Sequence, residues 1–585
     1  MKIAKLLFFF ILPIFIYAIE YDVKFLGLKD QKILNVVKNS TSLMKLKERP
    51  PKTVNSLKYR ANSDISNMIS ILKNYGYYDA NIKIDFEEKN NVLSVIIFIS
   101  TGPRYLIKKI DFINCETNQE IDEIKLHPKM IGLKIDDPII ARNIINAQKK
   151  LNYVFSNQGY PLHKVIKRDV VIDQSEKTAY ITWIVNLGSY SKFGATTITG
   201  LKDIKPSVIK KNIGYKEGEK YQISKVEETQ KQLLGTNLFS LVDIDHSKEV
   251  DEKNELLMNI KLYEALHKYF SAGVSYATIE GFGVSFNWAN KNFRNVGDLL
   301  SLDIDFAQRT FLGVLNFKKT DYLRKGQDYV LRLEAQREKI PSVYLAFNYF
   351  MLTRLDRKVN DNLSFSTGFK TEYIDVTNSA NPGHFFLLGV PTYLKYSSAN
   401  DLLNPTKGFT LIYFPKPYYN AINDRSFFLK QKVLSELYIP IDKNKKLVFA
   451  FRIQVGSIIG PNVFKLPMTK LFLGGSDDDL RGYKYHSVSP LVNNRPIGGR
   501  SAMFFTFEPR LRMSSSIGLV PFFDMGKVCL GRFPNFKNPW FKSLGVGFRY
   551  FSFFGPLRLD IGFPLNRRKG IDDVYKIYAS IGQTF

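Results

Sequence analysis

The sequence is poor in the residues that usually carry enzymatic or metal chemistry. It has two cysteines, Cys115 and Cys529, and six histidines scattered along 585 residues. No HExxH, CxxC or GxSxG motif occurs, so the usual signals of zinc proteases, redox proteins and serine hydrolases are missing. The cysteines lie far apart and are expected in different domains, so we expect no disulfide between them. We predict no catalytic residue, no metal site and no cofactor.

The sequence also contains no long apolar run after its N-terminal segment. The first residues read "MKIAKLLFFFILPIFIYA", in which Lys2 and Lys5 precede an apolar run and Ala18 follows it. This order is typical of a signal peptide, here residues 1–18, with a retained anchor as the alternative. The run is short for a spanning helix, which needs about 20 residues. We therefore expect an exported chain whose mature part has no transmembrane helix.

Acidic residues are outnumbered by basic ones, 55 Asp and Glu against 83 Lys and Arg, which gives a net charge of +28. Such a balance can indicate a nucleic-acid or an anionic-membrane partner. No zinc-finger spacing, RNA-binding signature or clustered basic arm occurs, and the lysines are spread evenly among Asn and Ile. We expect no nucleic-acid partner. The surplus charge would help the chain lie near anionic lipid headgroups.

The N-terminal part contains a weak internal repeat with the order strand, helix, strand, strand. Its three units cover residues 19–101, 102–190 and 191–265, roughly 80 residues each, a period that indicates tandem small domains. Apolar residues at helical spacing predict a helix around residues 53–75 and another in the second unit. The two stripes are Ile65, Met68, Ile69 and Leu72, and Ile140, Ile144, Ala147, Leu151 and Val154.

The periodicity changes after about residue 265, where apolar and polar residues alternate strictly. In "DLLSLDIDF" the apolar Leu300, Leu302, Ile304 and Phe306 lie opposite polar residues, and "VLRLEAQRE" alternates likewise. A strand with lipid on one side and water on the other has this pattern, and a soluble β-sandwich is the alternative. With an export signal and 14% aromatic residues, residues 266–585 predict a transmembrane barrel of about 16 antiparallel strands.

Several stretches resemble one protein superfamily, in which POTRA modules precede an outer-membrane barrel. They are "SSANDLLNPTKGFTL", "FLGGSDDDLRGY", "HSVSPLVNNRPIGGRSAMFFTFEPRLR" and "LVPFFDMGKV", and the helix-to-strand joints "GYYDA" and "NLFSLVDI" resemble those of POTRA domains. Three modules, and "GFGVSFNWANKNF" at the start of the barrel, most resemble the TamA family, the outer-membrane subunit of the translocation and assembly module. The BamA family usually carries five modules, and two-partner secretion transporters carry two.

The resemblance implies a non-enzymatic insertase in the outer membrane, with its modules in the periplasm. Its expected partners are unfolded outer-membrane or autotransported clients, outer-membrane lipid, and an inner-membrane-anchored protein resembling TamB. A BamA-type assembly factor, a passive pore and a barrel enzyme are the alternatives. Barrel closure depends on the seam between the first strand, within Lys268 to Ala277, and the last, within Tyr575 to Phe585. Glycine weakens a strand interior, so the expected seam residues are Gly273, Tyr575, Gly582 and Phe585.

The loop around "LFLGGSDDDLRGYKY" resembles the signature loop of the superfamily, which folds back inside the barrel as a lid. Its motif residues here are Gly474, Gly475, Arg481, Gly482 and Tyr483. The resemblance implies that Arg481 meets acids on the inner wall, and the matching acids are Glu508 and Asp524. Asp477 to Asp479 do not alternate with other residues as calcium ligands do, so we interpret them as turn residues that bond nearby amides.

Overall fold

The computed structural model describes residues 19–89, 92–277, 281–422, 424–537, 540–552 and 555–581. The predicted signal peptide, residues 1–18, lies outside them. Among the described residues, no helix has both the length and the apolar character that a membrane span requires. The chain forms two compact units. One contains most of the N-terminal modules, and the other contains the C-terminal sheet together with residues 201–211 and 234–241.

The N-terminal part contains three mixed sheets of three strands, and in each sheet the strand that comes last in the sequence lies in the middle. The first and last strands of each sheet run parallel, so the chain must cross over between them, and helices make the crossover.

The first module consists of β1 Tyr21–Leu26, α1 Gln31–Ser40, α2 Ser42–Lys45, α3 Val54–Asn74, β2 Asn81–Lys89 and β3 Val92–Ser100. The second consists of β4 Leu106–Asn114, the short helix η1 Pro128–Ile131, α4 Ala141–Asn157, β5 Lys164–Asp173 and β6 Thr178–Asn186. The third consists of β7 Lys192–Thr199, α5 Pro206–Asn212, α6 Ile223–Gly235, β8 Phe239–His246 and β9 Glu255–Glu264.

The predicted helix of the first module is α3, and local capping sets its limits. The Thr53 hydroxyl accepts the amide N–H of Ser56 at 3.2 Å and so begins the helix. Gly76, with φ of +91°, follows its end. The buried carboxylate of Asp64 accepts the amide N–H groups of Ser42 and Leu43 at 2.9 and 3.0 Å, which fixes α2 against α3.

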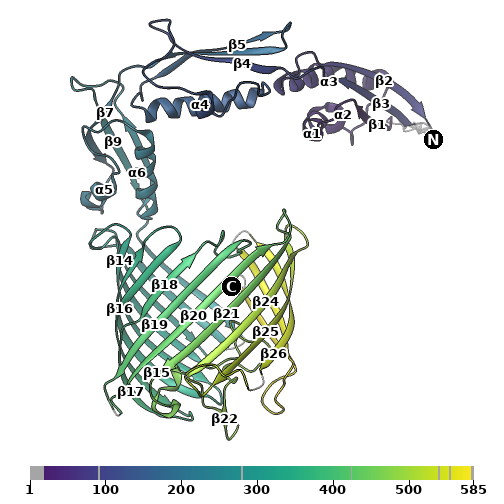
Figure 1. Cartoon of the computed structure of the whole chain (residues 1–585). Helices are drawn as coiled ribbons and strands as arrows, with labels where there is room; N and C mark the ends of the chain where they lie inside the picture. Colours follow the sequence, from purple (N-terminus) through teal and green to yellow (C-terminus); the bar gives the residue numbers. More distant parts are fainter. Residues whose placement is uncertain are drawn as a thin grey trace, which may run out of the picture. The chain divides into compact units, whose positions relative to one another are not determined.

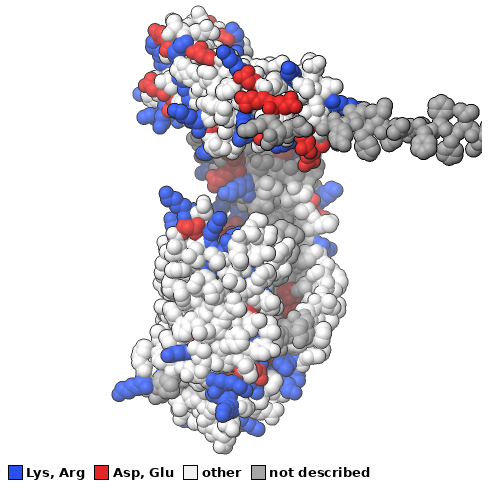
Figure 2. All heavy atoms as spheres, turned by 90° about the vertical axis from the view of Figure 1, so that its right-hand side faces the viewer, with Lys and Arg blue, Asp and Glu red and all other residues white. Residues whose placement is uncertain are grey.

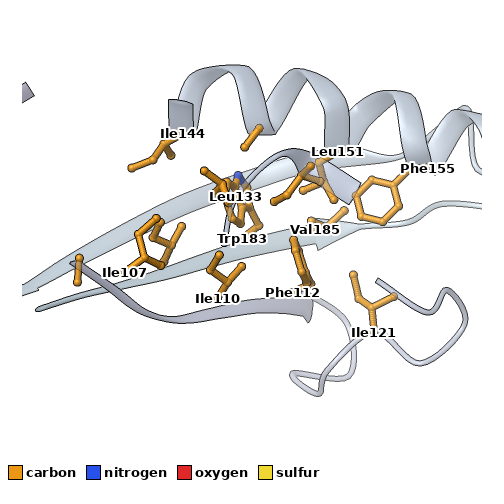
Figure 3. Packing of buried hydrophobic residues seen from close by; sticks show 14 of the residues in the cluster. Ile107, Ile110, Phe112, Ile121, Leu133, Ile144, Leu151, Phe155, Trp183 and Val185 are labelled. Carbon is orange, nitrogen blue, oxygen red and sulfur yellow. The ribbon is translucent and has the colours of Figure 1, made fainter. Parts of the chain in front are cut away.

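The second module shows how each module builds its own core (Figure 3). Side chains of α4 point down onto β4 and β6, where Phe112 stacks on the buried Trp183 with ring centroids 5.7 Å apart. The predicted stripe is partly wrong. Phe155, not Val154, completes the buried face of α4, and Ile140 precedes the helix as its N-cap. Phe155 lies four residues after Leu151, the spacing that keeps side chains on one helix face.

The C-terminal part forms one antiparallel sheet of 17 strands, which curves into a barrel (Figure 1). Its strands are β10 Lys268–Ala277, β11 Gly281–Phe293, β12 Asp298–Ala307, β13 Thr310–Lys319, β14 Gln327–Ile340, β15 Tyr344–Lys358, β16 Leu363–Thr377, β17 Gly383–Gly389, β18 Thr392–Ser397, β19 Gly408–Asn420, β20 Phe427–Pro440, β21 Leu447–Ile459, β24 Ser501–Arg512, β25 Ile517–Cys529, β26 Phe541–Ser552, β27 Gly555–Pro564 and β28 Lys576–Ile581. Both β17 and β18 pair with β16 on one side and β19 on the other. They therefore share one position, and Pro391, which cannot donate a ladder hydrogen bond, separates them.

The outer face of the barrel is apolar and exposed, whereas the inner face is polar. Large side chains such as Phe306, Phe369 and Leu437 point outward and are 61%, 49% and 39% exposed. On the face shown in Figure 2, uncharged residues form the middle of the wall, and Lys and Arg gather near its ends. This alternation is what lipid on the outside and water on the inside require.

Candidate functional site: the lid loop and the ion-pair network on the inner wall

Residues 460–500 connect β21 to β24 and pack inside the barrel; we call them the lid loop. The loop contains η2 Val463–Lys465, η3 Met468–Lys470 and a small hairpin, β22 Leu491–Val492 with β23 Arg495–Pro496. One group of its apolar side chains, including Leu466 and Met468, joins a core with residues of β15, β16, β17, β19, β20 and β21. A second group, Leu480, Tyr483 and Val488, packs on Ala502 and Phe504 of β24. The lid loop is therefore held by two separate parts of the inner wall.

A tight turn at the paired glycines brings the loop to the wall. Gly474 and Val488 exchange backbone hydrogen bonds of 2.9 and 3.0 Å. Gly475 has φ of +102°, and a Cβ there would lie 2.4 Å from the carbonyl oxygen of Lys484, so the turn requires glycine. The Asp479 carboxylate accepts the amide N–H groups of Gly475 and Ser476 at 2.9 and 2.8 Å. Asp479 thus acts on the turn as a backbone-bonding residue.

Arg481 is the centre of the site, and its side chain is only 1% exposed. The guanidinium forms a fork with Asp524, in which Nε and Nη2 donate to the two carboxylate oxygens at 2.7 and 2.8 Å. Its Nη1 donates to Glu508 at 2.8 Å and to Asp560 at 2.8 Å. The guanidinium also lies 3.4 Å from the ring centroid of Phe522. Such a planar, permanently charged group can bond several acceptors at once, which an ammonium group cannot do in the same geometry.

Two of the three carboxylates that bond Arg481, namely Glu508 and Asp560, are also bonded by arginines of the wall. Arg510 donates to Glu508 at 2.9 Å, Arg558 donates to Asp560 at 2.7 Å, and Arg549 also pairs with Asp560. These residues come from β24, β25, β26 and β27 and point inward, with exposure between 0% and 6%. Buried charges are costly unless they are paired and hydrogen-bonded. The network meets that requirement: Arg481 connects β24, β25 and β27 directly, and Arg549 on β26 joins through Asp560.

The two residues after Arg481 extend the anchor toward the last strand of the sheet. Gly482 has φ of +93°, and its N–H donates to the hydroxyl of Tyr578 on β28 at 2.9 Å. A Cβ on Gly482 would lie 3.1 Å from Pro564 N, so the loop approaches the end of β27 closely. The Tyr483 hydroxyl donates to the carbonyl of Lys542 at 2.8 Å, at the start of β26.

The two ends of the 17-stranded sheet are β10 and β28. Within the described residues, β10 pairs only with β11 and β28 pairs only with β27. Among the described residues, the β27–β28 ladder runs from Gly562 opposite Lys576 to Leu557 opposite Ile581. Gly273 lies in β10 opposite Ser285, and the exposed Tyr575 immediately precedes β28. The other two predicted seam residues, Gly582 and Phe585, lie outside the described residues.

One group of potential metal ligands occurs among the described residues, and it is not part of the lid. Ligand atoms of Asp203, Glu264 and His267 lie within 4.8 Å of one another. The Glu264 carboxylate already accepts the amide N–H groups of Lys202, Asp203 and Ile204, at 2.8 to 3.1 Å. These bonds satisfy the carboxylate as a cap of the preceding loop without an ion.

From the sequence we predicted that Arg481 meets Glu508 and Asp524. The structure places the three side chains within hydrogen-bond distance. The prediction missed Asp560 and the three wall arginines. A signal was present, because in "PLRLDIGF" Arg558 and Asp560 alternate with Leu557, Leu559 and Ile561, as inward residues of a lipid-facing strand do. Tyr578 was placed on the last strand, but nothing in the sequence indicated its bond to Gly482.

The fold and the site together define a membrane barrel with an internal lid, preceded in the sequence by small α+β modules. The family model of the Omp85 superfamily domain matches residues 267–585, and the POTRA model, described as surface antigen variable number repeat, matches residues 191–264. The chain belongs to the Omp85 superfamily. It is an outer-membrane protein with periplasmic modules, and it belongs among assembly and transport factors rather than enzymes.

The chain is similar in sequence to distant relatives. The outer membrane protein assembly factor BamA of Nitratidesulfovibrio vulgaris is 23% identical over 543 residues, which cover 88% of this chain and 66% of that protein. BamA of Buchnera aphidicola is 24% identical over 246 residues, which cover 42% of this chain and 39% of that protein. The chain thus spans no more than about two thirds of the length of these two relatives. The crystal structure of BamA from Haemophilus ducreyi lacking POTRA domains 1–3 has a TM-score of 0.70 at 15% identity, and the match covers 82% of this chain and all of that one. That likeness shows the fold.

Proposed function

We propose that this protein is an insertase that helps unfolded outer-membrane or autotransported proteins to fold into, or cross, the outer membrane. The observation that carries the proposal is the pair of sheet ends, because β10 and β28 each have one ladder partner among the described residues. An unpaired strand edge presents a row of N–H and C=O groups that can template another strand. In lipid these backbone groups must be hydrogen-bonded. An unpaired strand edge in the membrane can therefore exchange its hydrogen-bond partners with an incoming strand.

In the proposed mechanism a client strand adds to the seam while its backbone is still unpaired. The client then exchanges hydrogen bonds with a template instead of entering lipid with its polar backbone groups unsatisfied. In this mechanism the C-terminal strand β28 forms one edge of the opening, and β10 forms the other. Gly273 in β10 contributes no side chain to the packing of the other edge.

The lid loop would control this seam. Arg481 connects the loop to β24, β25 and β27, and Gly482 bonds to Tyr578 on β28. The lid therefore holds the inner wall beside one edge of the seam in a fixed position. We propose that release of these contacts accompanies client entry. A passive open pore does not need a loop anchored in this way.

The modules would receive clients and a partner by strand addition. Each three-stranded sheet has two outer strands, and outer strands such as β2 and β5 offer free edges for an extended segment. We propose that the first two modules are POTRA domains like the third, because all three share the same strand order. The proposed periplasmic partner is an inner-membrane-anchored protein resembling TamB.

A second candidate function is general barrel assembly of the BamA type. The curated relatives BamA of Nitratidesulfovibrio vulgaris and of Buchnera aphidicola favour it. Three modules rather than five favour the TamA type. Depletion of the protein separates the two, because loss of a general factor reduces most outer-membrane barrels, whereas loss of a TamA-type factor reduces a restricted set.

The proposal is tested by reconstitution. The purified full chain is placed in liposomes, and a urea-denatured outer-membrane barrel is added. We expect the client to fold several times faster than in liposomes that contain an unrelated barrel of similar size. Equal rates in both kinds of liposome would contradict the insertase function.

A further inference from the structure

Five lysines gather on the inner face of the barrel beneath the lid loop, apart from the Arg481 network. Lys416 on β19 and Lys430 on β20 are direct cross-strand partners, and Lys432 lies two residues further along β20. Inward residues on these strands are even-numbered, since Tyr418 and Phe428 are buried whereas Tyr419 and Phe427 are exposed. Lys370 on β16 and Lys470 in the lid loop complete the group, which we call the lysine cluster.

The cluster has too few acids to balance it. Glu372 is bridged by Lys370 at 2.9 Å and Lys470 at 2.8 Å. Among the described residues no carboxylate forms an ion pair with Lys416, Lys430 or Lys432. Asp478 and Asp479 act on Lys432 from the lid, but Asp479 is already committed to the turn amides of Gly475 and Ser476. Like charges directly opposite each other in a sheet destabilise it, so the Lys416–Lys430 pair needs a compensating charge.

A cavity with unsatisfied polar atoms lies beside these lysines. Its volume is about 410 Å³, within the range of small-ligand pockets, and Lys416, Lys430 and Lys432 line it. The hydroxyl of Thr469 and the Nδ1 of His486 also line it, and both atoms are buried without a hydrogen-bond partner. Buried polar atoms in native proteins are normally paired. A second cavity of about 460 Å³ adjoins it, sharing Lys416 and reaching Lys370.

We propose that the lysine cluster binds a soluble anion that carries several phosphate groups, held in the lumen under the lid loop. Lysine ammonium groups act as point charges for phosphate, and a hydroxyl such as that of Thr469 can donate to a phosphate oxygen. The anion would neutralise the opposed lysines and satisfy the unpaired atoms in one step. Because Lys470 and Thr469 belong to the lid loop, a bound anion would also join the lid to β19 and β20. The proposal stands independently of the insertase function.

The placement favours a soluble phosphate ligand over the other sources of negative charge. A lipid headgroup would have to leave the apolar outer face, whereas the cluster points into the lumen. An acidic client segment would need an extended groove or a strand edge, but the lysines lie on the face of a continuous ladder from β19 to β21. A compact anion fits a cavity of about 410 Å³.

The test uses the purified full chain in an uncharged detergent, with inorganic tripolyphosphate as the probe and calorimetry as the readout. We expect saturable binding to the wild type, and a loss of affinity of at least roughly tenfold in Lys416→Met/Lys430→Met. Lys443→Met, in an exposed turn between β20 and β21, is the matched control and should bind as the wild type does. Thr469→Val removes the hydroxyl without changing charge, and a several-fold loss there would show a seated phosphate rather than general attraction.

A second readout keeps the proposal testable if the double variant folds poorly. Without phosphate, Lys430→Met should raise the thermal midpoint, because it removes the repulsion from Lys416. Tripolyphosphate should raise the midpoint of the wild type but not that of Lys430→Met, at constant ionic strength. Equal shifts in both proteins, or none in the wild type, would overturn the site. Binding of lipid A micelles or of an acidic peptide, without binding of tripolyphosphate, would overturn the choice of ligand.

Discussion

At the scale of single residues, the position of the lid loop depends on a few buried charges that are paired around Arg481. Arg481 donates to three carboxylates from three strands, so one loop residue determines whether Glu508, Asp524 and Asp560 are fully balanced. Because these charges are buried, leaving any one of them without a partner would cost several kcal/mol of free energy. The consequence is that the lid loop and the inner wall should respond to substitutions at Arg481 as one system.

Arg481→Ala should give an inserted barrel with a mobile lid loop and reduced assembly activity. The variant leaves three buried carboxylates without their shared partner, a loss of about 3 kcal/mol of lid anchoring. Limited proteolysis of residues 460–500 in intact membranes measures the loop, and client folding in liposomes measures activity. Unchanged proteolysis together with full activity would show that Arg481 does not anchor the lid.

Arg481→Lys should restore only part of the anchoring. A lysine keeps the charge but cannot form the fork with both oxygens of Asp524 while also reaching Glu508 and Asp560. Its proteolysis rate should lie between those of the wild type and of Arg481→Ala. If Arg481→Lys matched the wild type, charge alone would suffice and the geometry of the fork would not matter.

Gly482→Ala should destabilise the lid by about 1–2 kcal/mol, because φ of +93° suits glycine. The added Cβ would also press on Pro564 and Gly562 at 3.1 and 3.2 Å. Gly531→Ala, in the loop after β25, is the control, since its Cβ would meet only Phe533 at an ordinary 3.5 Å. Faster proteolysis of the lid in Gly482→Ala, with no change in Gly531→Ala, is the expected result. Equal rates in both variants would count against the close approach.

The sequence was enough to predict the contacts of Arg481 with Glu508 and Asp524, but not the remaining members of the ion-pair network around Arg481. Arg481, Glu508 and Asp524 lie in stretches that resemble the superfamily, whereas Asp560, Arg549 and Arg558 lie in ordinary alternating strands. Alternation shows that such residues point inward but not which of them meet, because that depends on strand register and on the path of the lid loop. The lysine cluster was missed for the same reason, since Lys416 and Lys430 become neighbours only through the β19–β20 ladder.

At the scale of elements, hydrophobic periodicity predicted the long regular pieces and failed at the irregular ones. Helix α3 and strand β12 follow directly from their apolar spacing. The sequence did not predict that β17 and β18 share one strand position between β16 and β19. It also did not predict the short elements η2, η3, β22 and β23 of the lid loop. A break at Pro391 and turns inside the lid loop depend on what packs against them, and short segments carry too few residues for a period to show.

The three modules should fold without the barrel, because each has its own buried cluster. The sequence predicts the end of the third module at residue 265, and its last strand β9 ends at Glu264, so a fragment of residues 20–260 would stop inside β9. A fragment of residues 20–265 should therefore be soluble and folded, with mixed helix and strand content by circular dichroism. The fragment that stops at 260 truncates β9 and should be less stable. An aggregated longer fragment would contradict the module boundaries.

The same fragment should lose stability as the pH falls through about 6.5, the ordinary pKa of histidine. Burial lowers the pKa of His163, whose Nδ1–H donates to the Tyr160 carbonyl at 2.7 Å. The unfolded chain then binds a proton more readily than the folded chain does, so stability is full above 6.5 and declines below it. Denaturation followed by the fluorescence of Trp183 measures this decline. In His163→Asn, which keeps a donor for Tyr160, the decline should be smaller; an identical slope would assign it to other groups.

At the scale of the whole molecule, the described residues form a barrel sheet whose two end strands each have one ladder partner, and three modules whose outer strands also have one each. Omp85 membership, the internal lid and these edges fit one activity, the transfer of strands from periplasm to membrane. The apolar run at the N-terminus led us to expect export, and the alternating strands led us to expect a membrane barrel. The superfamily followed from short motifs, whereas the particular clients and the periplasmic partner depend on surfaces that sequence patterns do not specify.

The most direct test of this account is a disulfide staple across the seam. In a chain with Cys115 and Cys529 replaced by serine, Ser271→Cys on β10 is combined in turn with Tyr578→Cys, Ala579→Cys or Ser580→Cys on β28. The control staple joins Leu559→Cys to Ala579→Cys, which already face each other in the β27–β28 ladder. We predict that the oxidised seam staple leaves a folded barrel that cannot assemble clients, that reduction restores activity, and that the control staple has no effect. Full assembly by a verified, oxidised seam staple would contradict the account.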